Sequence, residues 1–281
     1  MSRPVTTRGA PRGRDPEFTS VGGAPEDRRD AVEGSIEGVG VTKRFPRGVV
    51  ALDDVSFTIA PGTFASVVGP SGCGKSTLLR LIAGLTNTTG GVLRVSGTDV
   101  TGPRTDVGVM FQQPTLLAWK TALENALLPA QVRHSVRHED RVEAMSFLDL
   151  VGLRGFEHTF PRHLSGGMQQ RVALARLLMI GASTLLLDEP FGALDEFTRE
   201  RLNLELLRIH REVRATTVFI THNISEAVFL ADRVLVMTPR PGRLAGILEV
   251  PFGRERSVSL LKTPEFNELV FQVREMLGDS L

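Results

Sequence analysis

Apolar and polar residues alternate along short stretches of this chain, and the alternation begins at about residue 36. A period of two, interrupted by Gly and Pro, is typical of half-buried β-strands. The segments with this pattern are residues 37–45, 50–60, 62–69 and 90–97. Other runs are apolar throughout and end in polar residues, as buried parallel strands do. These runs are residues 183–189, 216–222 and 233–238.

Helical periodicity lies between these predicted strands. Residues 75–85 have the pattern of a helix, with one apolar stripe formed by Leu78, Leu79, Ile82 and Leu85. Residues 116–160 are also mainly helical in pattern. Strands that alternate with helices predict an α/β fold with a parallel sheet. Within that fold we expect a helical insertion at about residues 114–165.

The first 35 residues differ in composition from the rest of the chain. Residues 1–35 mix Pro, Gly, Arg, Asp and Glu with few large apolar groups. Such a segment cannot offset its ordering entropy by burial, so we expect a disordered tail. Contact of its arginines with anionic lipid stays open as an alternative, although acidic residues match them in number.

Length and composition limit the class of protein further. A chain of 281 residues that is 41% hydrophobic can bury a sizeable core, and a net charge of +1 argues against a nucleic-acid partner. Cys73 is the single cysteine, which excludes an intramolecular disulfide and a multi-cysteine metal site and fits a reducing compartment. The longest apolar run, residues 177–187, is too short to cross a bilayer, and no secretory signal is visible. We expect a cytosolic chain, or one that reaches a membrane only through partners.

Residues 69–77 read GPSGCGKST and match the phosphate-binding pattern G-x-x-x-x-G-K-[ST] between an expected strand and an expected helix. The glycines let successive N–H groups point at phosphate oxygens, and the helix N-terminus adds partial positive charge. Lys75 is expected to reach the β- and γ-phosphates, and Ser76 to contact Mg²⁺. The residues assigned to this nucleotide-binding loop are Gly69, Pro70, Ser71, Gly72, Cys73, Gly74, Lys75, Ser76 and Thr77.

Cys73 lies inside this loop, at a position that needs only a small side chain. One interpretation is a small filler without a redox role. The other is a thiol whose oxidation blocks nucleotide entry, because a helix N-terminus lowers the pKa of a thiol. Both interpretations stay open at this point.

Polar residues end two of the apolar runs. Asp188 and Glu189 close the run at 183–189, where Asp188 could hold Mg²⁺ through water and Glu189 could orient and deprotonate the attacking water. His222 closes the run at 216–222, at the sheet edge where α/β proteins gather ligands, and we expect it to contact the γ-phosphate. Taken alone, each of these residues could also be a solvated or structural side chain.

Five motifs occur in one order along the chain: GPSGCGKST, LSGGM, LLLDEP, GALD and ITH. In this order and rough spacing they resemble the ATP-binding cassette (ABC) ATPases, over residues of about 36–240. The resemblance implies a P-loop NTPase core with a parallel sheet, an antiparallel β-subdomain and a helical subdomain insertion at about 114–165. It also implies an ABC ATPase domain over residues 36–255 and a C-terminal helical extension over residues 256–281.

The stretch at residues 164–168, LSGGM, reads by itself as a helix start with unusually flexible residues. It resembles the family signature, which implies that Ser165, Gly166 and Gly167 bind the γ-phosphate of an ATP molecule held by a second copy of the chain. Two chains would then pack head to tail, each ATP lying between the Lys75 loop of one and the signature of the other. Met168 stands where the family most often has glutamine.

The same resemblance implies further roles. Gln112 would sense Mg²⁺ and couple the site to a transmembrane partner, with Gln113 as the less favoured alternative. Phe45 would stack on adenine, where a tyrosine is usual, and Asp195 would pass information across the dimer. The cofactors implied are ATP and Mg²⁺.

Residues 112–129, QQPTLLAWKTALENALLP, resemble importers of nitrate, taurine and aliphatic sulfonates. This likeness implies an ATPase subunit at the cytoplasmic face of a membrane, bound to permease subunits and indirectly to an extracytoplasmic solute-binding protein. Trp119 would lie on the permease-docking surface; an ordinary core or interface tryptophan is the alternative. The alternatives for the whole chain are an exporter ATPase subunit and a soluble ABC ATPase that acts on nucleic acid or the ribosome.

Overall fold

The computed structural model describes Met1 and residues 32–192, 194–253 and 255–278. The expected N-terminal tail lies outside these residues, except for Met1 and residues 32–35. Every helix within the described ranges is too short or too polar to span a bilayer.

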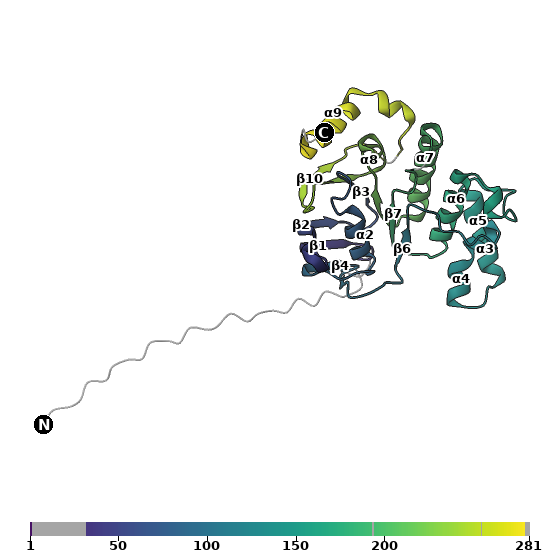
Figure 1. Ribbon diagram of the computed structural model, residues 1–281, viewed down its shortest axis with the longest axis horizontal. Helices are drawn as coiled ribbons and strands as arrows, with labels where there is room; N and C mark the ends of the chain where they lie inside the picture. The colour runs from purple at the N-terminus through teal and green to yellow at the C-terminus, as the bar shows by residue number, and fades with distance from the viewer. Residues whose placement is uncertain (2–31, 193, 254, 279–281) are drawn as a thin grey trace.

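The described residues form two sheets (Figure 1). Six strands of the described residues form the larger sheet in the order β10-β9-β3-β8-β7-β6. All neighbours in it are parallel except β9 and β10. Its strands are β3 (Phe64–Val68), β6 (Val107–Met110), β7 (Thr184–Asp188), β8 (Thr216–Ile220), β9 (Arg233–Met237) and β10 (Leu244–Glu249). Both β3 and β8 are buried along their whole length, as central parallel strands are.

The smaller sheet is antiparallel, with four strands among the described residues in the order β2-β1-β4-β5. These strands are β1 (Ile36–Arg44), β2 (Val50–Ile59), β4 (Gly90–Val95) and β5 (Thr98–Asp99). Buried side chains of this sheet share a core cluster with helix α2 (Lys75–Ile82) and with one face of the larger sheet. A short 3-10 turn, η1 (Pro46–Gly48), joins β1 to β2.

A group of helices lies to one side of the two sheets (Figure 1). It contains α3 (Ala122–Ala126), α4 (Leu128–Arg133), α5 (His138–Leu150), the turn η2 (Pro161–His163) and α6 (Gly166–Leu178). The side chain of Asn125 is buried in it and donates to the carbonyls of Leu117, Lys120 and Thr121. These bonds order the segment that precedes α3, because a buried amide must be paired.

The remaining helices cover the larger sheet. Helix α7 (Glu196–Val213) follows β7, and α8 (Ile224–Leu230) follows β8. The C-terminal segment contains η3 (Val258–Lys262) and α9 (Pro264–Leu277), and α9 packs against α8, β9 and β10. The parallel α/β sheet, the antiparallel β-sheet and the separate helices agree with the predicted fold class.

Two details differ from the sequence-based prediction. The helix expected over residues 75–85 ends at Ile82, and Leu85 is 52% exposed, so it does not extend the apolar stripe. Gly84 has a φ of +69°, and a Cβ there would lie 1.8 Å from the carbonyl oxygen of Gly102, so the chain turns at this glycine. The periodicity also missed β5 and β6, whose two and four residues are too few to show a period. It missed β10 as well, an edge strand whose register shifts between Leu244 and Gly246.

Candidate active site

Residues 69–74 connect β3 to α2, and together with the first residues of α2 they form the loop predicted at residues 69–77. Glycine conformations determine the shape of this loop. Gly72 and Gly74 have φ values of +76° and +112°. A Cβ at Gly74 would lie 2.7 Å from a methyl group of Leu52, so both the backbone angle and the packing require glycine there. The Lys75 ammonium donates to the carbonyl oxygens of Gly69 and Pro70, at 2.7 and 3.2 Å. The ammonium group is therefore held inside the curl of the loop.

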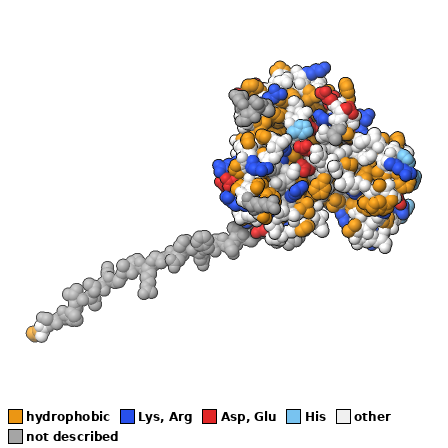
Figure 2. Space-filling view, in the orientation of Figure 1, with side chains coloured by type: hydrophobic (Ala, Val, Ile, Leu, Met, Phe, Trp, Pro, Cys, Tyr) orange, Lys and Arg blue, Asp and Glu red, His pale blue; other side chains and the backbone are white. Residues whose placement is uncertain are grey.

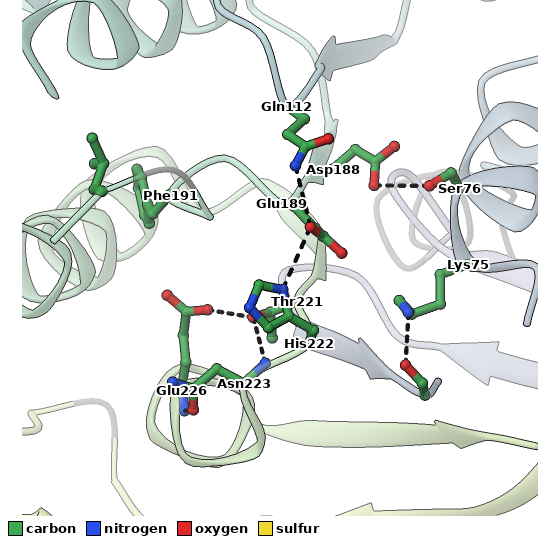
Figure 3. Close-up of polar contacts among 12 residues, drawn as sticks. Lys75, Ser76, Gln112, Asp188, Glu189, Phe191, Thr221, His222, Asn223 and Glu226 are labelled. Atoms are coloured by element: carbon green, nitrogen blue, oxygen red, sulfur yellow. Dashed lines mark hydrogen bonds and ion pairs between the residues drawn. The ribbon is translucent and has the colours of Figure 1, made fainter. Parts of the chain in front are cut away.

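Ser76, in the first turn of α2, contacts Asp188, the last residue of β7 (Figure 3). The Ser76 hydroxyl donates to the Asp188 carboxylate at 3.1 Å. Burial raises the pKa of Asp188, while the hydrogen bond from Ser76 opposes the shift. A hydroxyl and a carboxylate in contact fit Mg²⁺, which takes few protein oxygens and keeps water and phosphate ligands. No group of three or more His, Cys, Asp or Glu side chains in the described part of the chain could hold a metal alone.

The side chains of Gln112 and His222 converge on the Glu189 carboxylate (Figure 3), and the three residues follow three parallel strands. Gln112 follows β6, Glu189 follows β7 and His222 follows β8. The Gln112 amide nitrogen lies 3.4 Å from Glu189 Oε2, and His222 Nδ1 lies 3.5 Å from the same oxygen. Glu189 has a φ of +46°, in the left-handed region that is costly for a residue with a side chain, and strained residues of this kind cluster at active sites.

The turn that carries His222 is fixed by residues that the sequence analysis did not single out. The Thr221 hydroxyl donates to the carboxylate of buried Glu226 and accepts from the backbone N–H of Asn223. The Asn223 side chain in turn accepts from the N–H of Glu226 and caps α8. Asn223, followed three residues later by Glu226, was the available signal for this cap.

We expect Glu226→Gln to stabilise the fold at neutral pH. Burial raises the pKa of Glu226, opposed by its bond with Thr221, so ionisation of this carboxyl costs stability as pH rises above its unfolded-state pKa. Gln keeps an acceptor for Thr221 and removes the buried charge. The free energy of unfolding should rise by about 1 kcal/mol at pH 8 and change little at pH 4, where the carboxyl is largely neutral in both states. Denaturant titrations at the two pH values would measure this, and a loss of stability at pH 8 would contradict it.

The signature residues lie at the N-terminus of α6. Ser165 caps this helix by accepting from the N–H of Met168 at 3.3 Å. A Cβ at Gly167 would lie 3.2 Å from the Thr198 methyl group. Ser165, Gly166 and Gly167 line a hollow that also contains Asp195, whereas the Lys75 loop lines a different hollow. The structure therefore does not bring the signature and the phosphate loop of one chain into a single pocket.

Helix α6 is nevertheless linked to the Gln112 segment. The side chain of Gln170, buried in α6, donates to the Gln112 carbonyl oxygen at 2.9 Å. A displacement of α6 would pull directly on the segment that presents Gln112 to Glu189. Gln170 was not identified from the sequence, because nothing local distinguishes it from its neighbour Gln169.

The hollow beside the phosphate loop has a volume of about 340 Å³. Its lining residues are Phe45, Val49, Ala51, Ser71, Gly72, Gly74, Lys75, Ser76, Thr77, Glu189 and Arg240. Phe45 is 39% exposed at the start of η1, and the Lys43 ammonium lies 5.2 Å from the centre of its ring. An apolar ring at one part of the hollow and the phosphate loop at another match the two ends of a nucleotide.

Asp195 and Cys73 are two further residues of the predicted site. Asp195 caps α7 by accepting from the N–H of Thr198 at 3.0 Å, and this bond lowers the pKa of the Asp195 carboxyl. Cys73 is 1% exposed, and a Cβ on Gly69 would lie 2.9 Å from its sulfur. Such tight packing favours the interpretation of Cys73 as a small filler.

The site combines a parallel sheet, a glycine loop that carries a lysine, the Ser76–Asp188 pair and the Glu189 carboxylate. This combination defines a P-loop nucleoside triphosphatase. Comparison with known proteins narrows this class. Residues 52–192 match the model of the ABC transporter family. The chain belongs to this family, and it is an ATPase of the ABC type.

Several relatives align over most of their length. An uncharacterized ABC transporter ATP-binding protein of Methanocaldococcus jannaschii is 41% identical over 88% of this chain and 93% of its own. The taurine import ATP-binding protein TauB of Yersinia pestis is 44% identical over 82% of this chain and 95% of its own. The nitrate import ATP-binding protein NrtD of Synechococcus elongatus is 44% identical over 85% of this chain and 89% of its own.

A solved structure is similar in three dimensions. The dimeric ATP-binding cassette MJ0796, bound to ADP and Pi, superposes with a TM-score of 0.68. It is 32% identical, and the match covers 78% of this chain and 100% of that one.

Proposed function

We propose that this chain is the ATP-hydrolysing subunit of an ABC importer that takes up a small anion or organic solute of the nitrate, taurine or sulfonate kind. The proposal that the chain hydrolyses ATP rests on one observation: Gln112 and His222 converge on Glu189, beside the Ser76–Asp188 pair. The import direction and the solute class rest on the relatives named for taurine and nitrate import.

In the proposed mechanism, the loop at residues 69–77 binds the phosphates of ATP and Lys75 turns from the loop carbonyls to the β- and γ-phosphates. Phe45 packs on the adenine. Ser76, Asp188 and Gln112 would hold Mg²⁺, which would neutralise charge on the phosphates. Glu189 orients the attacking water and accepts its proton, while His222 contacts the γ-phosphate.

The second half of the site would come from another copy of the chain. Ser165, Gly166 and Gly167 lie apart from the Lys75 loop and line a separate hollow. A head-to-tail dimer would place this hollow over the γ-phosphate of the partner. Asp195, which borders the same hollow, would then lie at the interface. The dimeric state of the similar cassette MJ0796 supports this arrangement.

The helical group would dock on a membrane permease. Trp119 is 72% exposed, and Phe111 is also exposed beside Gln112. Figure 2 shows further hydrophobic side chains gathered on the surface of this group. The bond from Gln170 to the Gln112 carbonyl connects this region to the carboxylate at which hydrolysis would occur. We infer peripheral attachment at the cytoplasmic face of the membrane and indirect contact with an extracytoplasmic solute-binding protein.

Affinity purification of the full chain in mild detergent tests the proposal. A polytopic membrane protein should co-purify with it. Co-purification with ribosomes or DNA instead would contradict it and favour a soluble ABC ATPase. Uptake of labelled nitrate, taurine and alkanesulfonates by cells with and without this gene would then identify the solute and the direction of transport.

We expect Trp119→Glu to reduce the amount of co-purified membrane protein by about 10-fold or more, because burial of an aromatic anchor often dominates an interface. Phe271→Glu is the matched control, since Phe271 is an exposed aromatic residue on α9. Unchanged thermal unfolding of the isolated chain would show that the Trp119 variant is folded. Equal losses for both variants, or none for either, would contradict docking at Trp119.

A further inference from the structure

The loop between β9 and β10, residues 238–243, packs against the nucleotide hollow. Gly242 pairs with β2: its N–H donates to the Ala51 carbonyl, and its own carbonyl accepts from the N–H of Asp53, both at 3.0 Å. A Cβ at Gly242 would lie 2.0 Å from the carbonyl oxygen of Cys73 in the phosphate loop. Only glycine allows this approach, so the position of the β9–β10 loop is tied to the phosphate loop.

Further bonds close the β9–β10 loop on itself and on β2. The N–H of Thr238 donates to the Arg243 carbonyl at 2.9 Å, and the N–H of Arg243 donates to the Thr238 hydroxyl at 3.0 Å. The Arg243 guanidinium pairs with Asp53, its Nε lying 3.1 Å from the carboxylate. Hydrogen bonds therefore fix the backbone of the β9–β10 loop at both ends. One side chain of this loop, between the two fixed ends, lines the nucleotide hollow.

That side chain is Arg240. It lines the same hollow as Phe45, Lys75 and Ser76. Its Nε lies 3.4 Å from the Gly72 carbonyl, which is long for a hydrogen bond. Within the described ranges no carboxylate lies at ion-pair distance from Arg240, unlike Arg243. The Arg240 guanidinium thus lies at the edge of the phosphate loop with one long hydrogen bond and with no ion-pair partner among the described residues.

We propose that the Arg240 guanidinium binds the phosphate chain of the nucleotide, as a cation supplied from outside the phosphate loop. A guanidinium has several fixed N–H donors that match phosphate oxygens, and it stays charged throughout the physiological pH range. The weak contact with Gly72 would be exchanged for charge-assisted hydrogen bonds when nucleotide enters. This inference rests on the nucleotide site proposed above.

The test compares two ligands by calorimetry on the full chain: MgATP, and Mg-tripolyphosphate, which has no adenosine. Arg240→Ala should weaken the binding of both by about 10-fold or more, the scale of a charged hydrogen bond. Arg240→Lys should recover part of the loss because it keeps the charge. Arg44→Ala is the matched control, since Arg44 is exposed beside Phe45 but does not line the hollow, and it should change affinity less than 2-fold.

Three results would overturn the proposal: native affinities in Arg240→Ala, a loss for MgATP alone, or an equal loss in Arg44→Ala. A loss for MgATP alone would assign Arg240 to adenosine. Lys75→Ala separates this inference from the proposed function. If Lys75→Ala abolishes binding while Arg240→Ala does not affect it, the nucleotide site stands and the role of Arg240 is refuted.

Discussion

Glu189→Gln is expected to bind MgATP, to pair with a second copy and to remain closed, while turnover falls by roughly 100-fold or more. An amide keeps the size of the side chain and its contacts with Gln112 and His222, but it accepts no proton from water. The γ-phosphate then stays in place and continues to hold the closed state, because closure depends on the affinity of intact ATP for that state. The variant should therefore be arrested after binding and before hydrolysis.

Size-exclusion chromatography with MgATP and a single-turnover phosphate assay would measure both parts of this result. Glu275→Gln makes the same chemical change at an exposed position on α9 and should hydrolyse ATP normally. Normal hydrolysis by Glu189→Gln would refute the role assigned to this carboxylate. Failure to bind MgATP would refute the assumption that Glu189 acts after binding.

Ser165→Arg should abolish cooperative hydrolysis without abolishing nucleotide binding. Ser165 lies at the N-terminus of α6 and lines a hollow separate from that of Lys75. A long cationic side chain there would fill the space that the partner's γ-phosphate needs. Hydrolysis should fall by roughly 100-fold or more, while MgATP affinity of the separate chains stays within about 2-fold, because the Lys75 loop is untouched.

Ser146→Arg is the matched control, an exposed serine on α5 in the same helical group. Loss of the cap at Ser165 could cost about 1 kcal/mol, so thermal unfolding of both variants is compared first. Mixing Ser165→Arg with Lys75→Ala gives a sharper result. Such a mixed pair has one intact site, formed by Lys75 of one chain and Ser165 of the other, so MgATP should dimerise the mixture although it dimerises neither variant alone. A mixture that stays monomeric with MgATP would contradict a shared site.

The bond between Gln170 and the Gln112 carbonyl would give a physical route between the two halves of the proposed site. Gln170 lies in the helix that begins with the signature, and Gln112 lies beside Glu189. ATP contacts at the N-terminus of α6 would therefore shift a rigid helix that is bonded to the segment near the carboxylate. A rigid element with two positions is the kind of connection that can couple distant sites.

Local sequence patterns were sufficient for much of the fold. The alternation at residues 37–45 and 50–60 identified the strands of the smaller sheet, and the apolar runs before Asp188 and His222 identified β7 and β8. The phosphate loop was identified from nine consecutive residues, because its shape depends on neighbours within the loop. These features have short-range causes: side-chain period, glycine conformations and the hydrogen bonds of a helix start.

Contacts between distant parts of the chain were decided by the tertiary structure alone. Gln112, Glu189 and His222 meet because parallel strands bring their C-terminal ends to one edge, and no periodicity encodes which side chains then touch. The helix after the phosphate loop ends at Ile82 because the approach of Gly102 to Gly84 forces a turn there. Arg240 enters the hollow because Gly242 pairs with β2, far away in the sequence. The sequence by itself determined the class of chemistry through its local motifs, and long-range packing determined which groups line the hollow beside the phosphate loop.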